Sequence, residues 1–304
     1  MTTFLYSFQS EWIKLRRSSA LWLTLVGGLL IPAIILIARL IRYKQTSQEN
    51  GLEQVWTILF NRCWENMAIL VLPVGIILVA SLIHQIEYRN NAWKQILTSP
   101  QSLHTIFWSK YLVVFLMLFG FFILLNLGIY LTGVIPALFY NSIPFPKGKF
   151  PIAFFVERNL YFMLGILPIL GFQYLMSLHI KNFIVPIGIG FALLVASLIG
   201  ISWEHNYTLP YNYAAIEYLM GNRHLPIQGN IRSWAVSYFF LATIISYVLF
   251  LFKNQDLRLH YGKVLIIVFI LNLLWVICIW GFSTKKNITN KSSMLINIQY
   301  VVHS

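Results

Sequence analysis

The sequence predicts an all-α polytopic membrane protein. Hydrophobic residues make up 58% of its 304 residues, charged residues make up only 10%, and the mean hydropathy is +0.71. Soluble domains average about 25% charged residues, so the composition excludes a soluble protein. Seven stretches have the roughly 20 apolar residues that a helix needs to cross a bilayer. They cover residues 20–41, 67–86, 106–132, 160–179, 183–203, 234–252 and 263–282.

Features within the spans predict local geometry. Only a few residues around Lys181 and Asn182 separate the fourth and fifth spans, which predicts a tight helical hairpin. Neighbouring helices in a membrane can re-satisfy the backbone groups that prolines free, so the prolines within the spans are compatible with crossing. These prolines are Pro32, Pro73, Pro168 and Pro186. Arg39 and Arg42 end the first span, where they can extend to the headgroups.

The first 19 residues predict a helix in the membrane interface. Apolar residues recur there at helical spacing among the charged residues Glu11, Lys14, Arg16 and Arg17. A signal peptide is the alternative, because the basic start suits one. No small-residue cleavage site follows the apolar run, which favours a retained helix.

Three connections are long enough to be structured. Residues 42–66 combine bulky apolar and charged residues, which predicts an interfacial helix, and the proline-rich residues 133–158 predict an ordered loop. Residues 204–233 contain a helical patch from Ala214 to Met220. Basic residues divide almost evenly between the two sides of the predicted topology, so the positive-inside rule leaves the orientation open.

A polar segment after the second span predicts a short amphipathic helix. Trp93, Ile96 and Leu97 share one face at helical spacing, while Arg89 and Lys94 lie on the other. A short helix held between two spans can act as a lever, on which a component outside the membrane exerts force.

The sequence predicts where this short helix ends and where the next helix begins. Pro100 closes the short helix, because proline disfavours the helical conformation at the preceding residue and supplies no N–H. Ser102 then starts the next helix as its N-cap, and the run from Ile106 enters the membrane.

The chain lacks the motifs of several enzyme and transporter classes. Lys147-Gly148-Lys149 is followed by Phe150 and does not make a phosphate-binding loop, and the histidines and two cysteines have no metal-binding spacing. No Asp or Glu lies near the centre of a span, which argues against an ion-coupled transporter and an intramembrane hydrolase. The energy source is therefore expected on another polypeptide.

The net charge of +13 points to lipid rather than nucleic acid. Lys and Arg number 22 against nine Asp and Glu, a balance that favours contact with anionic lipid headgroups. There is no soluble basic domain on which nucleic-acid binding could rest.

Three stretches together resemble the permease subunits of ABC-2 type ABC transporters. Residues 11–17 resemble that family's E-x-x-K-x-x-R interfacial helix, and residues 252–257 resemble the basic-Asp ending of its sixth span. Residues 87–100 resemble its cytoplasmic coupling segment, E-x-x-x-N/G-T-W-K-x-L-L-T-x-P, with Ala92 in place of the common Thr. The residues that match this pattern and the lysine that follows it are Glu87, Asn91, Trp93, Lys94, Leu97, Thr98, Pro100 and Lys110.

The resemblance implies a fold of six core transmembrane helices, an N-terminal interfacial helix and a cytoplasmic coupling helix. It assigns residues 1–257 to the permease domain. Residues 258–304 then form an additional C-terminal transmembrane helix, at 263–282, and a tail. A seventh span departs from the family pattern, in which both chain ends are cytoplasmic.

The resemblance also implies a function. Such permeases pair with an identical or related permease and with ABC ATPase subunits, which bind ATP and Mg²⁺, so no cofactor or catalytic site is expected on this chain. The pattern is most similar to permeases for lantibiotics and other peptide antibiotics, which implies export of a peptide antibiotic, lipid or other amphipathic cargo across a plasma membrane, such as the bacterial inner membrane. ATPase coupling falls to Glu87, Arg89, Asn91, Trp93, Lys94, Ile96, Leu97 and Pro100, and the interfacial helix carries Glu11, Lys14, Arg16 and Arg17.

Three alternatives remain open at this point. Trp93 and Lys94 can instead anchor an interfacial helix among lipid headgroups. The span count also fits a seven-span receptor or sensor, which an extracellular N-terminus would favour. A membrane-bound enzyme acting on lipid would need clustered acid, base or metal-binding residues near one interface, and the sequence offers no convincing cluster.

Overall fold

The computed structural model describes residues 2–16, 18–89, 101–203, 205–223 and 230–252, which form one compact unit. Helices and their connections make up this described part, and it contains no strand. The predicted seventh span at 263–282 and the domain boundary at residue 257 lie outside the described residues.

Six helical runs are long and apolar enough to cross a membrane, which confirms the core of the predicted fold. They are α2 (Ser19–Ile41), the continuous run of α4 (Val55–Asn66), η1 (Met67–Val71) and α5 (Leu72–Arg89), α7 (Leu103–Phe139), α8 (Ile152–His179), α9 (Ile184–Ile199) with η2 (Gly200–Ser202), and α11 (Ile231–Phe252). The shorter helices are α1 (Thr2–Arg16), α3 (Tyr43–Asn50), η3 (Asn206–Thr208) and α10 (Tyr213–Arg223). Six crossings bring the described part of the chain back to its starting side.

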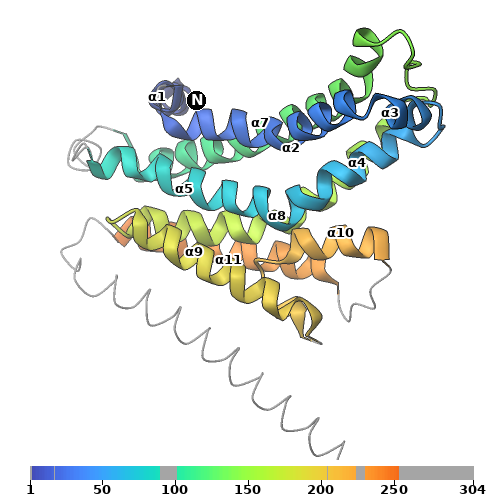
Figure 1. Cartoon of the computed structure of the whole chain (residues 1–304). Coiled ribbons are helices and arrows are strands. Elements are labelled where there is room, and N and C mark those ends of the chain that lie inside the picture. The colour runs from blue at the N-terminus through green and yellow to red at the C-terminus, as the bar shows by residue number, and fades with distance from the viewer. Residues whose placement is uncertain (1, 17, 90–100, 204, 224–229, 253–304) are drawn as a thin grey trace, which may run out of the picture. The chain divides into compact units, whose positions relative to one another are not determined.

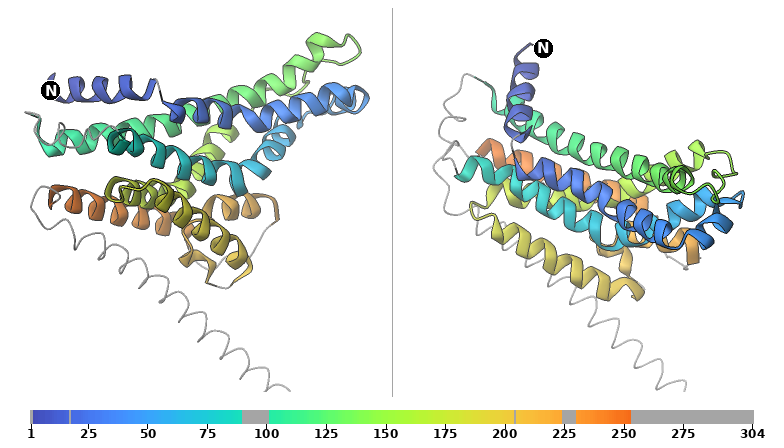
Figure 2. Two further views of the ribbon diagram at one scale, coloured as in Figure 1. Left: turned by 60° about the vertical axis from the view of Figure 1, so that its left-hand side comes forward. Right: turned by 45° about the horizontal axis from the view of Figure 1, so that its top comes forward.

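The spans pack around α8, which is the most buried of them. α11 and α5 lie along α8, and α2 lies along α7 (Figures 1 and 2). The close approach of α2 and α7 needs Gly128, because a Cβ at this position would lie 2.7 Å from the Cβ of Pro32. α8 and α9 form the hairpin that the sequence predicts around Lys181.

Different helices lie at the two ends of this bundle. The α1 end holds α1, the last turn of α5 and the first turns of α7, while the opposite end holds α3, the start of α4 and α10 (Figure 1).

A π-turn at Met67–Val71 joins α4 to α5 within one membrane-length run. Pro73 follows it and has no N–H, so the carbonyl four residues earlier loses its normal α-helical donor. In the π-turn, Leu72 N donates to Met67 O, five residues earlier, and the helix continues past Pro73 as α5.

The prediction of an interfacial helix at residues 42–66 was wrong for its second half. Trp56, Leu59 and Phe60 of α4 are buried in the protein core instead of lying in lipid headgroups. The loop between α7 and α8 covers Trp56, whose Nε1 donates a 2.8 Å hydrogen bond to Gly148 O. Phe155 and Phe162 of α8 pack on Phe60. These contacts are tertiary, so apolar periodicity alone did not reveal them.

Other local predictions were confirmed. Ser102 caps α7, and its Oγ accepts a hydrogen bond from Thr105 N. The helical patch from Ala214 to Met220 is part of α10. The proline-rich loop is shorter than predicted, because α7 continues to Phe139 and α8 begins at Ile152.

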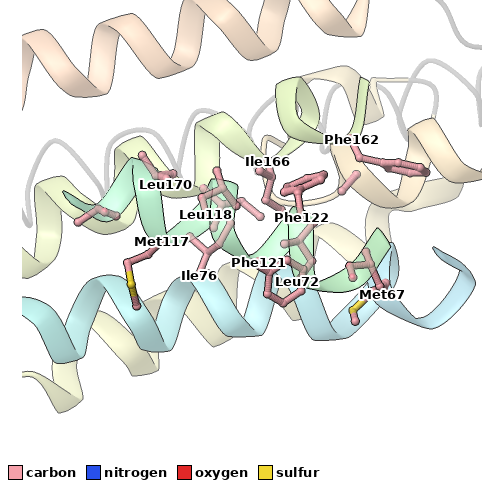
Figure 3. Close-up of a cluster of buried hydrophobic side chains, with 14 of the residues drawn as sticks. Met67, Leu72, Ile76, Met117, Leu118, Phe121, Phe122, Phe162, Ile166 and Leu170 are labelled. Carbon is pink, nitrogen blue, oxygen red and sulfur yellow. The ribbon is translucent and has the colours of Figure 1, made fainter. Parts of the chain in front are cut away.

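The main hydrophobic core lies between α4, α5, α7 and α8. Figure 3 shows its side chains, among them Leu72 and Ile76 of α5 facing Leu118 and Phe122 of α7.

Candidate functional site

Charged residues from three separate parts of the sequence meet at the α1 end. Glu11 and Lys14 lie on α1, Glu87 lies in the last turns of α5, and Lys110 lies in the second turn of α7. We call these four residues the charge cluster. All four belong to the motifs that the sequence analysis singled out.

Lys110 joins the two carboxylates. Its Nζ lies 2.9 Å from Glu11 Oε2 and also forms an ion pair with Glu87 Oε1. Lys14 Nζ lies 2.7 Å from Glu11 Oε1 and 3.5 Å from Glu87 Oε1. The cluster thus ties α1, α5 and α7 together by electrostatic contacts.

The centre of the charge cluster is removed from solvent. The side chain of Lys110 is 2% exposed and that of Glu87 is 4% exposed. Burying such ions costs several kcal/mol each unless they are paired, so removing one partner is far more damaging than removing the whole set. No described residue donates a hydrogen bond to Glu87 Oε2, although this oxygen is buried.

The pKa of Glu11 follows from its place in the cluster. Burial by itself would raise this pKa, but the positive charges of Lys110 and Lys14 and the hydrogen bonds they donate outweigh burial. The net effect lowers the pKa of Glu11 below its ordinary value of 4.5, so the carboxylate is ionised at neutral pH.

Neutral hydrogen bonds extend the cluster to neighbouring helices. Ser7 Oγ and Ser109 Oγ lie 2.9 Å apart and join α1 to α7 a short distance from Lys110. Tyr88, next to Glu87, donates a 2.5 Å hydrogen bond to Leu178 O at the end of α8. The last turn of α5 is therefore fastened to α1, α7 and α8.

Part of the predicted coupling set can be placed. Glu87 is buried in the charge cluster, and Arg89 is the last residue of α5. On α1, Glu11 and Lys14 join the cluster while Arg16 is exposed. The side chain of Arg89 and the whole of Arg17, Asn91, Trp93, Lys94, Ile96, Leu97, Thr98 and Pro100 lie outside the described residues, so their roles stay predictions.

The sequence analysis missed the pairing itself. It assigned Glu11 and Glu87 to two separate motifs and treated Lys110 only as the start of the third span. A signal was available, because a lysine beside the apolar run from Ile106 would be costly without a partner, and the topology puts both glutamates at the same membrane face. The sequence could not show which of the two glutamates would pair with Lys110.

A second polar group, the opposite-end cluster, consists of Arg39, Glu49, Asn50 and Arg62. Arg39 does not extend to the headgroups as predicted; it is 3% exposed and bonds to Glu49 Oε2 at 2.9 Å and to Asn50 Oδ1 at 2.5 Å. Arg62 also binds Glu49, at 3.1 Å. Asn50 Nδ2 donates to Pro144 O at 2.8 Å, which ties the loop after α7 to α3.

Uncharged polar residues cross-link the spans between these two ends. Gln173 of α8 donates 2.9 Å hydrogen bonds from Nε2 to Ser81 Oγ of α5 and to Pro186 O of α9. Within the described ranges, no group of three His, Cys, Asp or Glu side chains could hold a metal ion.

The charge cluster, the first four spans and most of the fifth lie within a stretch that matches a protein family. The family model of the ABC-2 family transporter proteins matches residues 7–197, more than half of the chain. The chain belongs to the ABC-2 transporter family. No curated protein and no solved structure matches it.

Membership in the ABC-2 family decides one of the alternatives that the sequence left open, the class of membrane protein. Together with the six spans of the described part, it makes the chain a multi-pass membrane protein. Family membership makes it a permease, the membrane component of a transporter, rather than a receptor. The match begins before Glu11 and ends after Lys110, so the ABC-2 region contains the whole charge cluster.

Proposed function

We propose that this ABC-2 permease exports an amphipathic cargo, namely a peptide antibiotic of the lantibiotic type, a lipid or a similar molecule, with energy from ATP hydrolysed by a separate ABC ATPase subunit. A second permease, identical or related, completes the membrane part. Residues 87–100 receive the motion of the ATPase at the α1 end, which is then the cytoplasmic end.

The observation that carries the proposal is the ion pairing of Lys110 with Glu11 and Glu87. Glu87 opens the coupling motif at the end of α5, and Lys110 is the lysine that follows the motif, near the start of α7. A displacement of the segment between them acts on both helices, and the shared Lys110 prevents either helix from moving alone. Glu11 adds α1 to the same unit.

The long helices can carry a movement from the α1 end across the membrane. The run from α4 to α5 covers 34 residues and α7 covers 37, so each reaches from the charge cluster to the opposite end. Packed helices move as rigid bodies, and a small shift at one end therefore reaches the far end. The scarcity of charge within the spans supports an amphipathic or apolar cargo.

The test is copurification of the full-length chain from native membranes, followed by an ATPase assay. The wild-type chain is expected to bring down an ABC ATPase that hydrolyses ATP. Replacing Trp93 and Leu97 with Asp is expected to abolish the association, since a charged side chain on the apolar face would be buried in the contact.

Leu52→Asp is the matched control. Leu52 is an exposed apolar residue between α3 and α4 at the opposite end, so this variant is expected to keep the ATPase bound. A wild-type chain without an ATPase would overturn the transporter proposal. An intact complex in the Trp93 and Leu97 variant would overturn the coupling assignment.

A further inference from the structure

The end of the bundle opposite the charge cluster carries an exposed strip of aromatic and basic side chains, which has no role in the coupling described above. It consists of residues 42–50, which include α3, and of residues 140–149 in the loop between α7 and α8 (Figure 1). We call this strip the ridge. Its exposed side chains are Arg42, Tyr43, Lys44, Tyr140, Phe145, Lys147 and Lys149.

Hydrogen bonds hold the two parts of the ridge together. Asn50 Nδ2 donates to Pro144 O at 2.8 Å, and Asn50 O accepts from Lys147 N at 3.0 Å. The rings of Tyr43 and Tyr140 stack with their centroids 5.6 Å apart. The loop therefore lies along α3, and the two form one continuous surface.

The length of α7 places the ridge beyond the hydrocarbon core. From Lys110 in the charge cluster to Phe139, α7 rises by about 43 Å at 1.5 Å per residue. At a tilt of about 20° this is still about 40 Å along the membrane normal, against ~30 Å of hydrocarbon. Because the charge cluster belongs at one boundary of the hydrocarbon, the end of α7 lies about 10 Å beyond the other.

Large aromatic side chains remain exposed at this height. Phe139 is 73% exposed and Phe145 is 59% exposed. The headgroup layer is only about 5–7 Å thick, so phospholipid does not cover side chains 10 Å beyond the hydrocarbon. Exposed apolar groups outside the membrane mark a surface that binds another molecule.

The charge of the ridge selects acidic groups. Its four exposed cations form no ion pair with another described residue. Of the nearby carboxylates, Glu49 is already bound to Arg39 and Arg62, and Glu53 is the exposed one beside the loop. A surface with this excess of positive charge attracts acidic ligands and repels cationic ones.

We propose that the ridge binds the exported cargo on the far side of the membrane, and that this cargo is an acidic amphipathic peptide. Its apolar face contacts Phe139 and Phe145, while its carboxylates lie near the lysines of the loop. The proposal rests on the export function proposed above and narrows its cargo, because the ridge repels a cationic peptide.

The first experiment determines where the ridge lies. Phe145→Cys is introduced together with Cys278→Ser and labelled in intact cells with a membrane-impermeant maleimide; Cys63 is buried and stays unlabelled. Phe145→Cys is expected to react. Lys181→Cys, exposed between α8 and α9, is the control and is expected to react only in permeabilised cells. Labelling of Lys181→Cys alone in intact cells would overturn the ridge as a site on the far side.

The second experiment measures peptide binding. The full-length chain in phosphatidylcholine nanodiscs, without an ATPase, is titrated with a fluorescent amphipathic helical peptide of Leu and Glu, and anisotropy gives the Kd. Binding to one site per chain is expected, and the same peptide with Lys in place of Glu is expected not to bind. Because no ATPase is present, failure of this test is distinct from failure of the transporter proposal.

Two variants assign the binding to the ridge. Lys147→Glu is expected to weaken binding about fivefold, because an attraction is replaced by a repulsion. Phe145→Ser removes an apolar contact and is also expected to weaken binding about fivefold. Both side chains are exposed, so the fold is expected to stay intact. Lys181→Glu, the matched charge reversal at the other end, is expected to bind as the wild type does.

Three outcomes would overturn the peptide site. They are absence of binding by the wild type, equal affinity of Lys147→Glu and Lys181→Glu, and tighter binding of the Lys peptide than of the Glu peptide. A lipid contact is tested by labelling Phe145→Cys in nanodiscs that contain phosphatidylglycerol. Protection from the maleimide there would assign the ridge to anionic headgroups and would likewise overturn the peptide site.

Discussion

The two ends of the described bundle both bury charge, but they do so in opposite ways. At the α1 end, Lys110 is shared between the carboxylates of Glu11 and Glu87. At the opposite end, the carboxylate of Glu49 is shared between Arg39 and Arg62. A cation is thus central to one cluster and an anion to the other.

The clusters also differ in what they connect. The residues of the opposite-end cluster follow one another between α2 and α4, so it fastens neighbouring segments and the loop after α7. The charge cluster instead joins α5 and α7 to α1, which α2, α3 and α4 separate from them in the chain. This difference indicates that the opposite-end cluster maintains local structure, whereas the charge cluster can transmit a movement between spans.

The largest effect is expected from Lys110→Met. Among the described residues, this variant leaves Glu87 with Lys14 as its remaining ion-pair partner, at 3.5 Å, and it breaks a buried ion pair, which typically costs about 3–5 kcal/mol. Thermal unfolding in detergent is expected to show a much lower midpoint, and ATP hydrolysis in the complex is expected to lose its response to the permease.

The triple variant Lys110→Met, Glu11→Gln, Glu87→Gln is the control for this prediction. Removing all three charges leaves no unpaired ion in the buried centre of the cluster, because Lys14, which loses both carboxylate partners, is 35% exposed to solvent. Most of the stability is therefore expected to return while coupling stays lost. A triple variant as unstable as Lys110→Met would show that ion pairing is not what stabilises this end.

A smaller effect is expected from Arg39→Met at the opposite end. Glu49 keeps its partner Arg62, so the main loss is the set of hydrogen bonds from a buried guanidinium, worth about 1–3 kcal/mol. ATP hydrolysis in the complex is expected to stay normal. Loss of coupling in this variant would remove the functional distinction between the two ends.

The lowered pKa of Glu11 gives a pH-dependent test of the charge cluster. Because the pKa of Glu11 is lowered in the folded protein, its contribution to stability is complete above about pH 4.5 and is lost as the pH falls through the folded value. The unfolding midpoint is expected to fall less steeply below pH 4.5 in Glu11→Gln than in the wild type. Glu157→Gln, at an exposed glutamate, is expected to leave the wild-type profile unchanged.

The smallest effect is expected from Arg62→Gln. The side chain of Arg62 is 42% exposed, and exposed ion pairs contribute about 0–1 kcal/mol. Unfolding midpoints at low and high salt measure it. A loss larger than that of Arg39→Met would mean that Arg62, rather than Arg39, is the main partner of Glu49.

Much of the local structure could be predicted from the sequence. Six apolar stretches predict the six spans because the bilayer sets their length, and Ser102 predicts the start of α7 because its hydroxyl can accept from a free backbone N–H. The motif residues of the charge cluster could also be identified individually. The burial of Trp56 could not, because it depends on a loop about 90 residues away.

The sequence by itself determined that this chain is a helical membrane protein with motifs of an ABC-2 permease, because apolar length and residue order are local properties. Only the tertiary structure decided that Lys110 joins Glu11 to Glu87 and that the loop after α7 lies along α3. Both features depend on which faces of these segments lie against each other. The free energy that selects those faces comes from contacts between distant segments, which helical periodicity does not specify.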